Sequence, residues 1–288
     1  MKIILLSFIL ILSIMSTSYS QKHSCCEEEG TTGSDITAPN IMATFGNDQS
    51  FKDEHPQPVA FTLLDGKGKM VTYKTGDGVD ANGYEVRSDN PTNNWVFIFH
   101  EWYGLNDYIK KEAEEIVTTL GNVNVLAIDL YDGKVATNND EAVKYVQSVD
   151  NTRALNIING AKDYAGSDAV FATVGWCFGG SWSNQAAIEL GSRCNACVMY
   201  YGMPEQNMDR LAKLKAPVLG IFANLDTRIT PEVAAKFEND LKSLNIPVNI
   251  YEYDAVHGFA NPSNPKHNPD ATKDAKEKTY AFLKEKMK

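Results

Sequence analysis

The chain has 288 residues, of which 43% are hydrophobic and 22% are charged, close to the average of an ordinary soluble globular protein. This composition excludes a collagen, a coiled coil, a disordered polyampholyte and a polytopic membrane protein. Asp and Glu number 37 and Lys and Arg number 27, so the formal charge of −10 has the wrong sign for a general binder of nucleic acids or anionic membranes.

The first 20 residues have the pattern of a cleavable secretion signal. Lys2 supplies a positive charge, an apolar run follows over residues 3–15, and the small residues Ser18 and Ser20 precede the expected cleavage point. The run is too short for a comfortable membrane span, and an uncleaved anchor is the alternative interpretation. We therefore expect an exported protein, periplasmic or extracellular, without stable membrane insertion once the signal is removed. A mature N-terminus still at Met1 would contradict this expectation.

Residues 21–57 show no sustained periodicity and are rich in Glu, Gly, Thr, Ser, Asp and Pro. Such a composition is typical of a flexible acidic arm. We expect the folded domain to span residues 58–288.

Beyond this arm, short apolar runs alternate with segments of helical periodicity. This alternation predicts one α/β domain with a mostly parallel sheet and helices on both faces. An antiparallel strand or two is expected within residues 70–86. The later strands are expected at residues 95–99, 123–128, 170–174, 196–201, 217–223 and 248–253, and the helices at residues 108–120, 141–164, 178–190, 231–244 and 271–286. In such sheets, the chemistry lies in the loops at the carboxyl ends of the strands.

A cysteine stands on a glycine-rich turn directly after one of these strands. The run 170–174 continues into GWCFGG (residues 175–180) and then into a helix. Because a nucleophile between a strand and a helix stands on a strained turn, it needs glycines two positions to either side, here Gly175 and Gly179. The turn directs the amide of Phe178 at an incoming carbonyl oxygen, as half of an oxyanion hole, and the helix N-terminus favours the thiolate of Cys177. The alternative interpretation is a buried structural cysteine in a glycine turn.

An acid and a histidine follow the cysteine at the ends of two later strands. The run 217–223 leads to Asp226, and the run 248–253 leads to His257. Nucleophile, acid and histidine in this order are typical of the α/β-hydrolase arrangement. Asp129 and Asp254 are rival acids because both also follow strands. Asp129 comes too early for the order and Asp254 is placed to cap a local turn, so we favour Asp226.

The other four histidines have weaker claims to the catalytic position. His23 and His55 lie in the expected arm, His267 lies in a polar loop, and His100 lies inside the motif that follows strand 95–99. His257 is therefore the predicted catalytic imidazole.

Five stretches of the chain resemble the dienelactone hydrolase family. They are VFIFHEWYGLN (96–106), LAIDLYDG (126–133), GWCFGG (175–180), LD (225–226) and HGFA (257–260). The resemblance extends from about residue 60 to the C-terminus. It implies an α/β-hydrolase fold and a Cys-Asp-His triad made of Cys177, Asp226 and His257.

The resemblance also implies roles for two residues that follow strand 95–99. In the family, a glutamate at the position of Glu101 contacts the resting thiol and takes its proton when substrate arrives, and the amide of Trp102 is the second oxyanion donor. From the residues alone, Glu101 follows a strongly apolar strand, where burial raises the pKa of a carboxyl group. A surface glutamate at the start of the next helix is the alternative interpretation.

One departure from the family bears on the substrate. The family's archetype holds its glutamate and its substrate's carboxylate with arginines, one of them four residues after the catalytic histidine, where this chain has Asn261. No arginine stands between Arg87 and Arg153. The charge-assisted clamp for an acidic lactone is therefore missing, and we do not expect dienelactone as the substrate.

The sequence thus predicts hydrolysis of a small-molecule ester or lactone through a thioester on Cys177, with no metal, no organic cofactor and no nucleic-acid partner. Glu101 or His257 would remove the thiol proton. His257, oriented by Asp226, would protonate the leaving group and activate water. A non-catalytic binding protein of the same fold is one alternative.

The second alternative is a thiol redox protein that pairs Cys177 with Cys194 or Cys197. These two cysteines form C-x-x-C between a helix end and a strand, where core cysteines or one disulfide are the ordinary interpretations. Cys25 and Cys26 are adjacent in the arm. Five cysteines are too few for a disulfide scaffold of this size, so the core is expected to come from packing.

Overall fold

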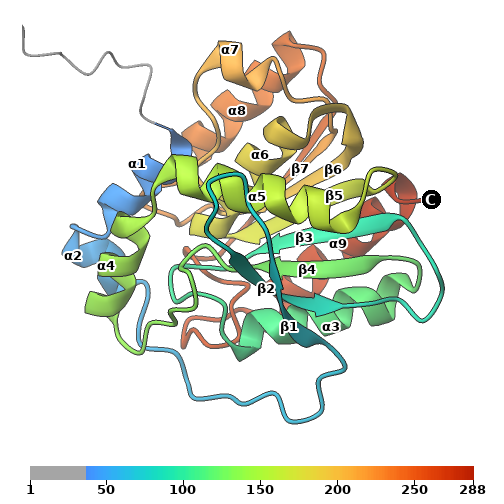
Figure 1. The fold of residues 1–288 in the computed structure, drawn as a ribbon. Coiled ribbons are helices and arrows are strands. Elements are labelled where there is room, and N and C mark those ends of the chain that lie inside the picture. The colour runs from blue at the N-terminus through green and yellow to red at the C-terminus, as the bar shows by residue number, and fades with distance from the viewer. Residues whose placement is uncertain (1–36) are drawn as a thin grey trace, which may run out of the picture. The chain divides into compact units, whose positions relative to one another are not determined.

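An eight-stranded sheet forms the centre of the fold. The computed structural model describes residues 37–288, in which the strands follow the order β1-β2-β4-β3-β5-β6-β7-β8 (Figure 1). β2 is antiparallel to β1 and to β4, and all other neighbouring pairs are parallel, which confirms the predicted fold class. The strands are β1 (Lys69–Tyr73), β2 (Ala81–Val86), β3 (Asn94–Phe99), β4 (Asn124–Ile128), β5 (Val170–Trp176), β6 (Cys194–Tyr200), β7 (Val218–Ala223) and β8 (Val248–Tyr253).

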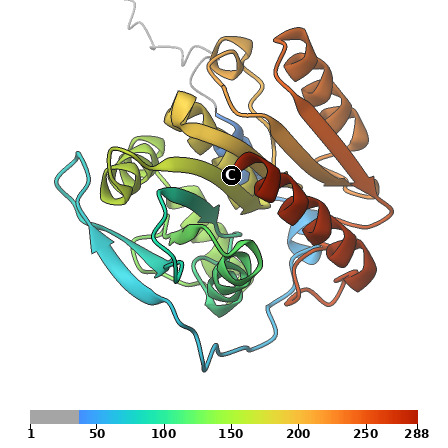
Figure 2. The same cartoon turned by 90° about the vertical axis from the view of Figure 1, so that its right-hand side faces the viewer.

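Helices cover both faces of this sheet. α3 and α9 contact each other on one face, while α5 and α6 contact each other on the other (Figures 1 and 2). α8 lies against β7 and β8. The helices are α1 (Ala38–Phe45), α2 (Gln49–Asp53), α3 (Asp107–Leu120), α4 (Asn139–Ser148), α5 (Asn151–Ala165), α6 (Phe178–Leu190), α7 (Met208–Leu211), α8 (Pro231–Ser243) and α9 (Pro269–Lys286).

The central strands are apolar along their whole length because helices cover them from both sides. Every residue of β4 and of β7 is buried. At the edge, β8 has no buried residue, and intermediate and exposed positions alternate over its first four residues. This contrast is typical of a parallel sheet covered on two faces, and it explains why the apolar runs of the sequence locate the central strands well.

The segment expected as one helix over residues 141–164 is divided into α4 and α5. Val149 has an extended ψ of 114°, and the side chain of Asp150 accepts the amide hydrogen of Arg153 at 2.8 Å. An aspartate in this geometry begins a new helix. Both helices have a buried apolar face, so the apolar periodicity continues across the break. Periodicity alone therefore does not reveal where α4 ends and α5 begins.

The described part of the expected flexible arm is folded. Residues 38–45 and 49–53 form α1 and α2, and α1 lies against α4 and α6 (Figure 1). Asp48 begins α2 by accepting the amide hydrogen of Ser50 at 2.8 Å, and Met42 and Phe51 are buried. The prediction of a flexible arm is therefore wrong for residues 37–57, and the folded domain begins before residue 58. Helices of eight and five residues are too brief to produce a clear periodic signal.

The predicted signal sequence and residues 21–36 of the predicted arm lie outside the described residues, so export remains a prediction. Within residues 37–288, no helix is both long enough and apolar enough to cross a membrane. Among residues 37–288, Cys194 and Cys197 are free and buried in β6, which favours the interpretation of the C-x-x-C as core cysteines.

Candidate active site

Cys177 stands on the turn between β5 and α6. Its φ of 53° lies in the left-handed region that residues with a side chain rarely adopt. A Cβ on Gly175 would collide with the carbonyl oxygen of Gly179, and a Cβ on Gly179 would collide with that of Phe99. The two glycines therefore let β5, α6 and the end of β3 meet around a strained cysteine, as the sequence predicts for a nucleophile turn.

The thiol lies in a desolvated position at the start of α6. Cys177 is only 1% exposed. Burial raises the pKa of its thiol above the usual value, although the facing His257 ring and the amide of Phe178 act in the opposite direction. As the first residue of α6, Phe178 has an amide without an acceptor inside the helix, so that N–H is available to an oxyanion. Trp102 is buried on the loop after β3, the strand next to β5.

His257 and Asp226 form a buried pair, as the sequence predicts. The Nδ1 atom of His257 lies 2.5 Å from Oδ2 of Asp226, and both side chains are fully buried. The amides of Arg228 and Ile229 donate to Oδ1 of Asp226 at 2.8 and 2.9 Å, which fixes the carboxylate. Burial favours the neutral form of each group, but their mutual attraction raises the pKa of His257 well above its usual value and lowers that of Asp226.

The two rival acids lie in other surroundings. The carboxylate of Asp129 accepts the amide hydrogens of Tyr131 and Gly133 at 2.9 and 2.5 Å and so holds the loop after β4. Asp254 is exposed to solvent. Of the three candidate acids, the structure brings Asp226 to the histidine.

Glu101 is buried at the end of β3 and is held by two neutral groups. The hydroxyl of Tyr201 donates to its Oε1 at 3.0 Å, and the side-chain amide of Asn261 donates to its Oε2. Burial raises the pKa of Glu101 to about 6, and the Tyr201 hydrogen bond opposes that rise. The resemblance placed this glutamate on the resting thiol, but its hydrogen bonds go to Tyr201 and Asn261. Tyr201, at the end of β6, has no motif around it and was not predicted.

The hydrogen-bond partner of the thiol is His55, which sequence reasoning assigned to the arm. The sulfur of Cys177 lies 3.5 Å from Nε2 of His55, and His55 is 4% exposed. Its ring lies beside those of Trp102 and His257, with centroid distances of 4.4 and 4.8 Å. Phe51 and His55 stand four positions apart, after Asp48, which can begin a helix. This spacing is a signal in the sequence for a helical face that carries His55.

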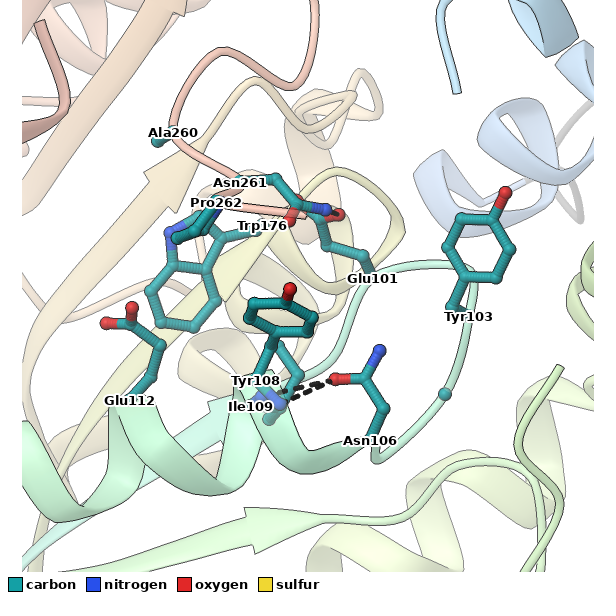
Figure 3. A pocket seen from close by; sticks show the side chains of 11 residues that line it. Glu101, Tyr103, Asn106, Tyr108, Ile109, Glu112, Trp176, Ala260, Asn261 and Pro262 are labelled. Carbon is teal, nitrogen blue, oxygen red and sulfur yellow. Dashed lines mark hydrogen bonds between the residues drawn. The ribbon is translucent and has the colours of Figure 1, made fainter. Parts of the chain in front are cut away.

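A small cavity with a free volume of about 30 Å³ adjoins Glu101. Figure 3 shows Glu101 and Asn261 pointing toward one another at this cavity, with Tyr108 nearby. The lining holds two carboxylates and neither Lys nor Arg: it consists of Glu101, Tyr103, Gly104, Asn106, Tyr108, Ile109, Glu112, Trp176, Ala260, Asn261 and Pro262. Cys177, which is buried, is not among the lining residues.

His55, Cys177 and His257 could also share a metal ion. Among the residues that the structure describes, these three form the group of such side chains whose ligand atoms lie within 4.8 Å of one another. The same atoms are a sulfur on a nucleophile turn, its hydrogen-bond partner and the imidazole of an acid–histidine pair. A sulfur beside the imidazole of an acid–histidine pair is also an arrangement that allows acyl transfer without a metal.

The sheet, the turn that carries Cys177 and the buried acid–histidine pair are the arrangement typical of the α/β-hydrolase fold. The family model described as the dienelactone hydrolase family matches residues 81–287, and the chain belongs to this family. It is a carboxylic ester hydrolase of the dienelactone hydrolase type.

Relatives of similar sequence agree with this assignment, and solved structures share the fold. A carboxymethylenebutenolidase from a Pseudomonas species is 28% identical over 206 residues, covering 66% of this chain and 83% of the relative. Protein usf of Aquifex pyrophilus is 26% identical over 234 residues, covering 76% and 98%. A dienelactone hydrolase-like promiscuous phosphotriesterase from metagenomic libraries superposes with a TM-score of 0.65 at 18% identity, covering 77% of this chain and 99% of the other. This likeness shows the fold.

Proposed function

We propose that the protein hydrolyses neutral carboxylic esters or lactones through a thioester on Cys177. The sulfur attacks the substrate carbonyl carbon as its proton passes to a base in the site. The carbonyl electron pair then moves onto oxygen, where the amides of Phe178 and Trp102 donate to the oxyanion. His257 protonates the departing alkoxide. It then takes a proton from the water that attacks the thioester and releases the acid.

One observation above all supports this proposal, the buried pair of His257 and Asp226 beside a cysteine on a nucleophile turn. Asp226 accepts the Nδ1 hydrogen of His257, with 2.5 Å between Nδ1 and Oδ2, which leaves Nε2 for proton transfer. Nε2 is buried on the side of the Cys177 sulfur, which contributes to the raised pKa of His257. From there it can exchange a proton with an alkoxide or a water at the acyl carbon.

The cavity supports a neutral substrate. Its lining carries the carboxyl groups of Glu101 and Glu112 and no cation, and Lys276 reaches Glu112 from outside the lining at 2.6 Å. A substrate carboxylate placed there would lose hydration without gaining a charged partner. The rings of Tyr108 and Trp176 offer apolar contact instead.

Intact-protein mass spectrometry after rapid mixing with a 4-nitrophenyl ester tests the function. We expect an adduct with the mass of one acyl group, which peptide mapping places on Cys177 and which neutral hydroxylamine removes, because it is a thioester. Unchanged protein after exposure to a panel of neutral esters and lactones would favour the non-catalytic alternative. A loss of two protons with no adduct would favour the redox alternative.

Asn261→Arg is expected to shift the substrate preference toward anionic esters. The guanidinium would face Glu101 and the cavity, where it can bind a substrate carboxylate through two parallel hydrogen bonds. We expect kcat/KM for an ester that carries a carboxylate to rise at least about tenfold relative to its methyl-capped, neutral analogue, a difference of about 1.4 kcal/mol. Asn261→Gln is the matched control for added length without charge. An unchanged ratio in the arginine variant would contradict the proposed basis of specificity.

A further inference from the structure

We propose that His55 is a second catalytic imidazole, which holds the proton of the resting Cys177 thiol and accepts that proton when the sulfur attacks. This inference rests on the proposed thioester chemistry and adds a residue to it. The family model begins at residue 81, so His55 lies outside the matched region and no family motif assigns it a role. It comes from the segment around α2, which the fold brings back over the nucleophile turn.

The hydrogen bonds of His55 determine which of its ring nitrogens faces the sulfur with a lone pair. Nδ1 lies 2.8 Å from the carbonyl oxygen of Phe51. A carbonyl oxygen only accepts, so Nδ1 carries the hydrogen and donates it. In the neutral ring, Nε2 is then an acceptor, and it lies 3.5 Å from the sulfur of Cys177. The thiol S–H therefore donates to His55.

His55 and His257 differ in protonation because their surroundings differ. Burial, and then the charge of His257, lower the pKa of His55 to about 3, so its ring is neutral. Asp226 and the side chain of Cys177 raise the pKa of His257, so its ring is protonated, with Nε2 on the side of the sulfur. The resting site thus holds a thiol that donates to a neutral imidazole, with an imidazolium beside it. While His257 is charged, the lowered pKa makes His55 a weak base; loss of the His257 proton to the leaving group removes that charge, so the two proton transfers are coupled.

The two rings allow a closed proton cycle. In acylation, the sulfur–carbon bond forms, the thiol proton moves to Nε2 of His55, and His257 gives its proton to the departing alkoxide. In deacylation, neutral His257 takes a proton from the attacking water. When the thiolate is expelled, it recovers its proton from His55. Every group ends as it began, and neither ring has to serve both the sulfur and the leaving group in the same step.

The segment that carries His55 is attached firmly to the rest of the fold. The hydroxyl of Tyr103 donates to the carbonyl of His55 at 3.0 Å, Asn139 donates to that of Lys52 at 3.2 Å, and Asn264 donates to that of Glu54 at 3.1 Å. These contacts come from three different parts of the chain. They fix the imidazole over the sulfur to the precision that proton transfer requires.

The test measures acylation alone, in a background where deacylation is blocked. His257→Gln should form the acyl-enzyme from a 4-nitrophenyl ester, because nitrophenolate leaves without protonation, and should then stall. With this variant as the reference, adding His55→Leu is expected to slow the nitrophenolate burst on the order of 100-fold. Adding His55→Gln, whose amide can accept a hydrogen bond but cannot carry the proton, should slow it similarly. Adding Gln49→Ala, at an exposed position of α2 that leaves the imidazole and its anchoring contacts in place, should leave the burst within about threefold.

The outcomes separate this inference from the proposed function. A burst that stays fast in both His55 variants would overturn the role of His55 while leaving the thioester chemistry intact. A burst that slows in the leucine variant but not in the glutamine variant would also overturn it, since a hydrogen bond alone would then suffice. Absence of any acyl adduct in the unsubstituted protein would instead overturn the proposed function. A thermal melt of each variant shows whether a slower burst results from unfolding. If His55→Leu unfolds, the burst of His55→Gln provides the test.

Discussion

Replacing Cys177 with alanine is expected to lower kcat for a neutral activated ester by about 10⁴- to 10⁶-fold, the range found when a nucleophile of a catalytic triad is removed. The reason is chemical, because the sulfur on the turn between β5 and α6 is the atom that would bond to the acyl carbon. The fold should survive, since cysteine and alanine both carry a Cβ and the backbone strain at φ 53° is common to both. Steady-state hydrolysis of a 4-nitrophenyl ester, combined with a thermal melt, measures both quantities.

Cys197→Ala is the matched control for Cys177→Ala. Cys197 is free and fully buried in β6, and its Sγ lies 3.9 Å from the hydroxyl of Ser183. Its loss leaves a small cavity, which costs on the order of 1 kcal/mol of stability and should leave kcat within a few fold. Retention of more than about 1% of the activity in Cys177→Ala would contradict the proposed mechanism, because a triad does not work at that level without its nucleophile.

The architecture was predictable because its signals are local in the sequence. The strands covered on both faces appear as continuous apolar runs, as in residues 95–99 and 217–223. The nucleophile turn is recognisable because the close approach of β5 and α6 admits only glycine at Gly175 and Gly179. The chain order of Asp226 and His257 after Cys177 then follows from the topology, since successive parallel strands end at the same edge.

The parts of the site that escaped prediction depend on contacts across long stretches of chain. His55 reaches Cys177 over 122 positions, and Asn261 reaches Glu101 over 160. The spacing of Phe51 and His55 indicates a helical face, but nothing near either residue indicates what that face contacts, and the same holds for Asn261. Tyr201 is a further example: it follows an ordinary buried strand, and its hydrogen bond to Glu101 depends on how β6 lies relative to β3. Residues on the nucleophile turn were therefore found by motif, while the side chains that tune their protonation required the fold.

His257→Gln is expected to lower kcat for an unactivated alkyl ester by about 10⁴- to 10⁶-fold, comparable with loss of the nucleophile, because the proposed mechanism assigns both leaving-group protonation and water activation to His257. Glutamine rather than alanine keeps a side-chain N–H for Asp226, so that its buried carboxylate is not left without a partner. With a 4-nitrophenyl ester, the same variant should release one equivalent of nitrophenolate and then stop. Rapid-mixing absorbance measures this burst, and continued turnover after it would contradict the role of His257 in deacylation.

The same variant should change how stability depends on pH. The pKa of His257 is higher in the folded state than the usual value of about 6.5. Its pairing with Asp226 therefore stabilises the folded state fully below pH ~6.5, and this contribution disappears as the pH rises through the raised folded pKa. Asp226 has a lowered pKa, so its contribution is present above about pH 4 and is lost as the pH falls through the folded value. The difference in unfolding free energy between the unsubstituted protein and His257→Gln should be greatest between about pH 4 and 6.5 and should shrink at higher pH. Urea titrations at pH 5, 7 and 9 measure it, and a difference that grew with pH would show that His257 is neutral in the folded protein.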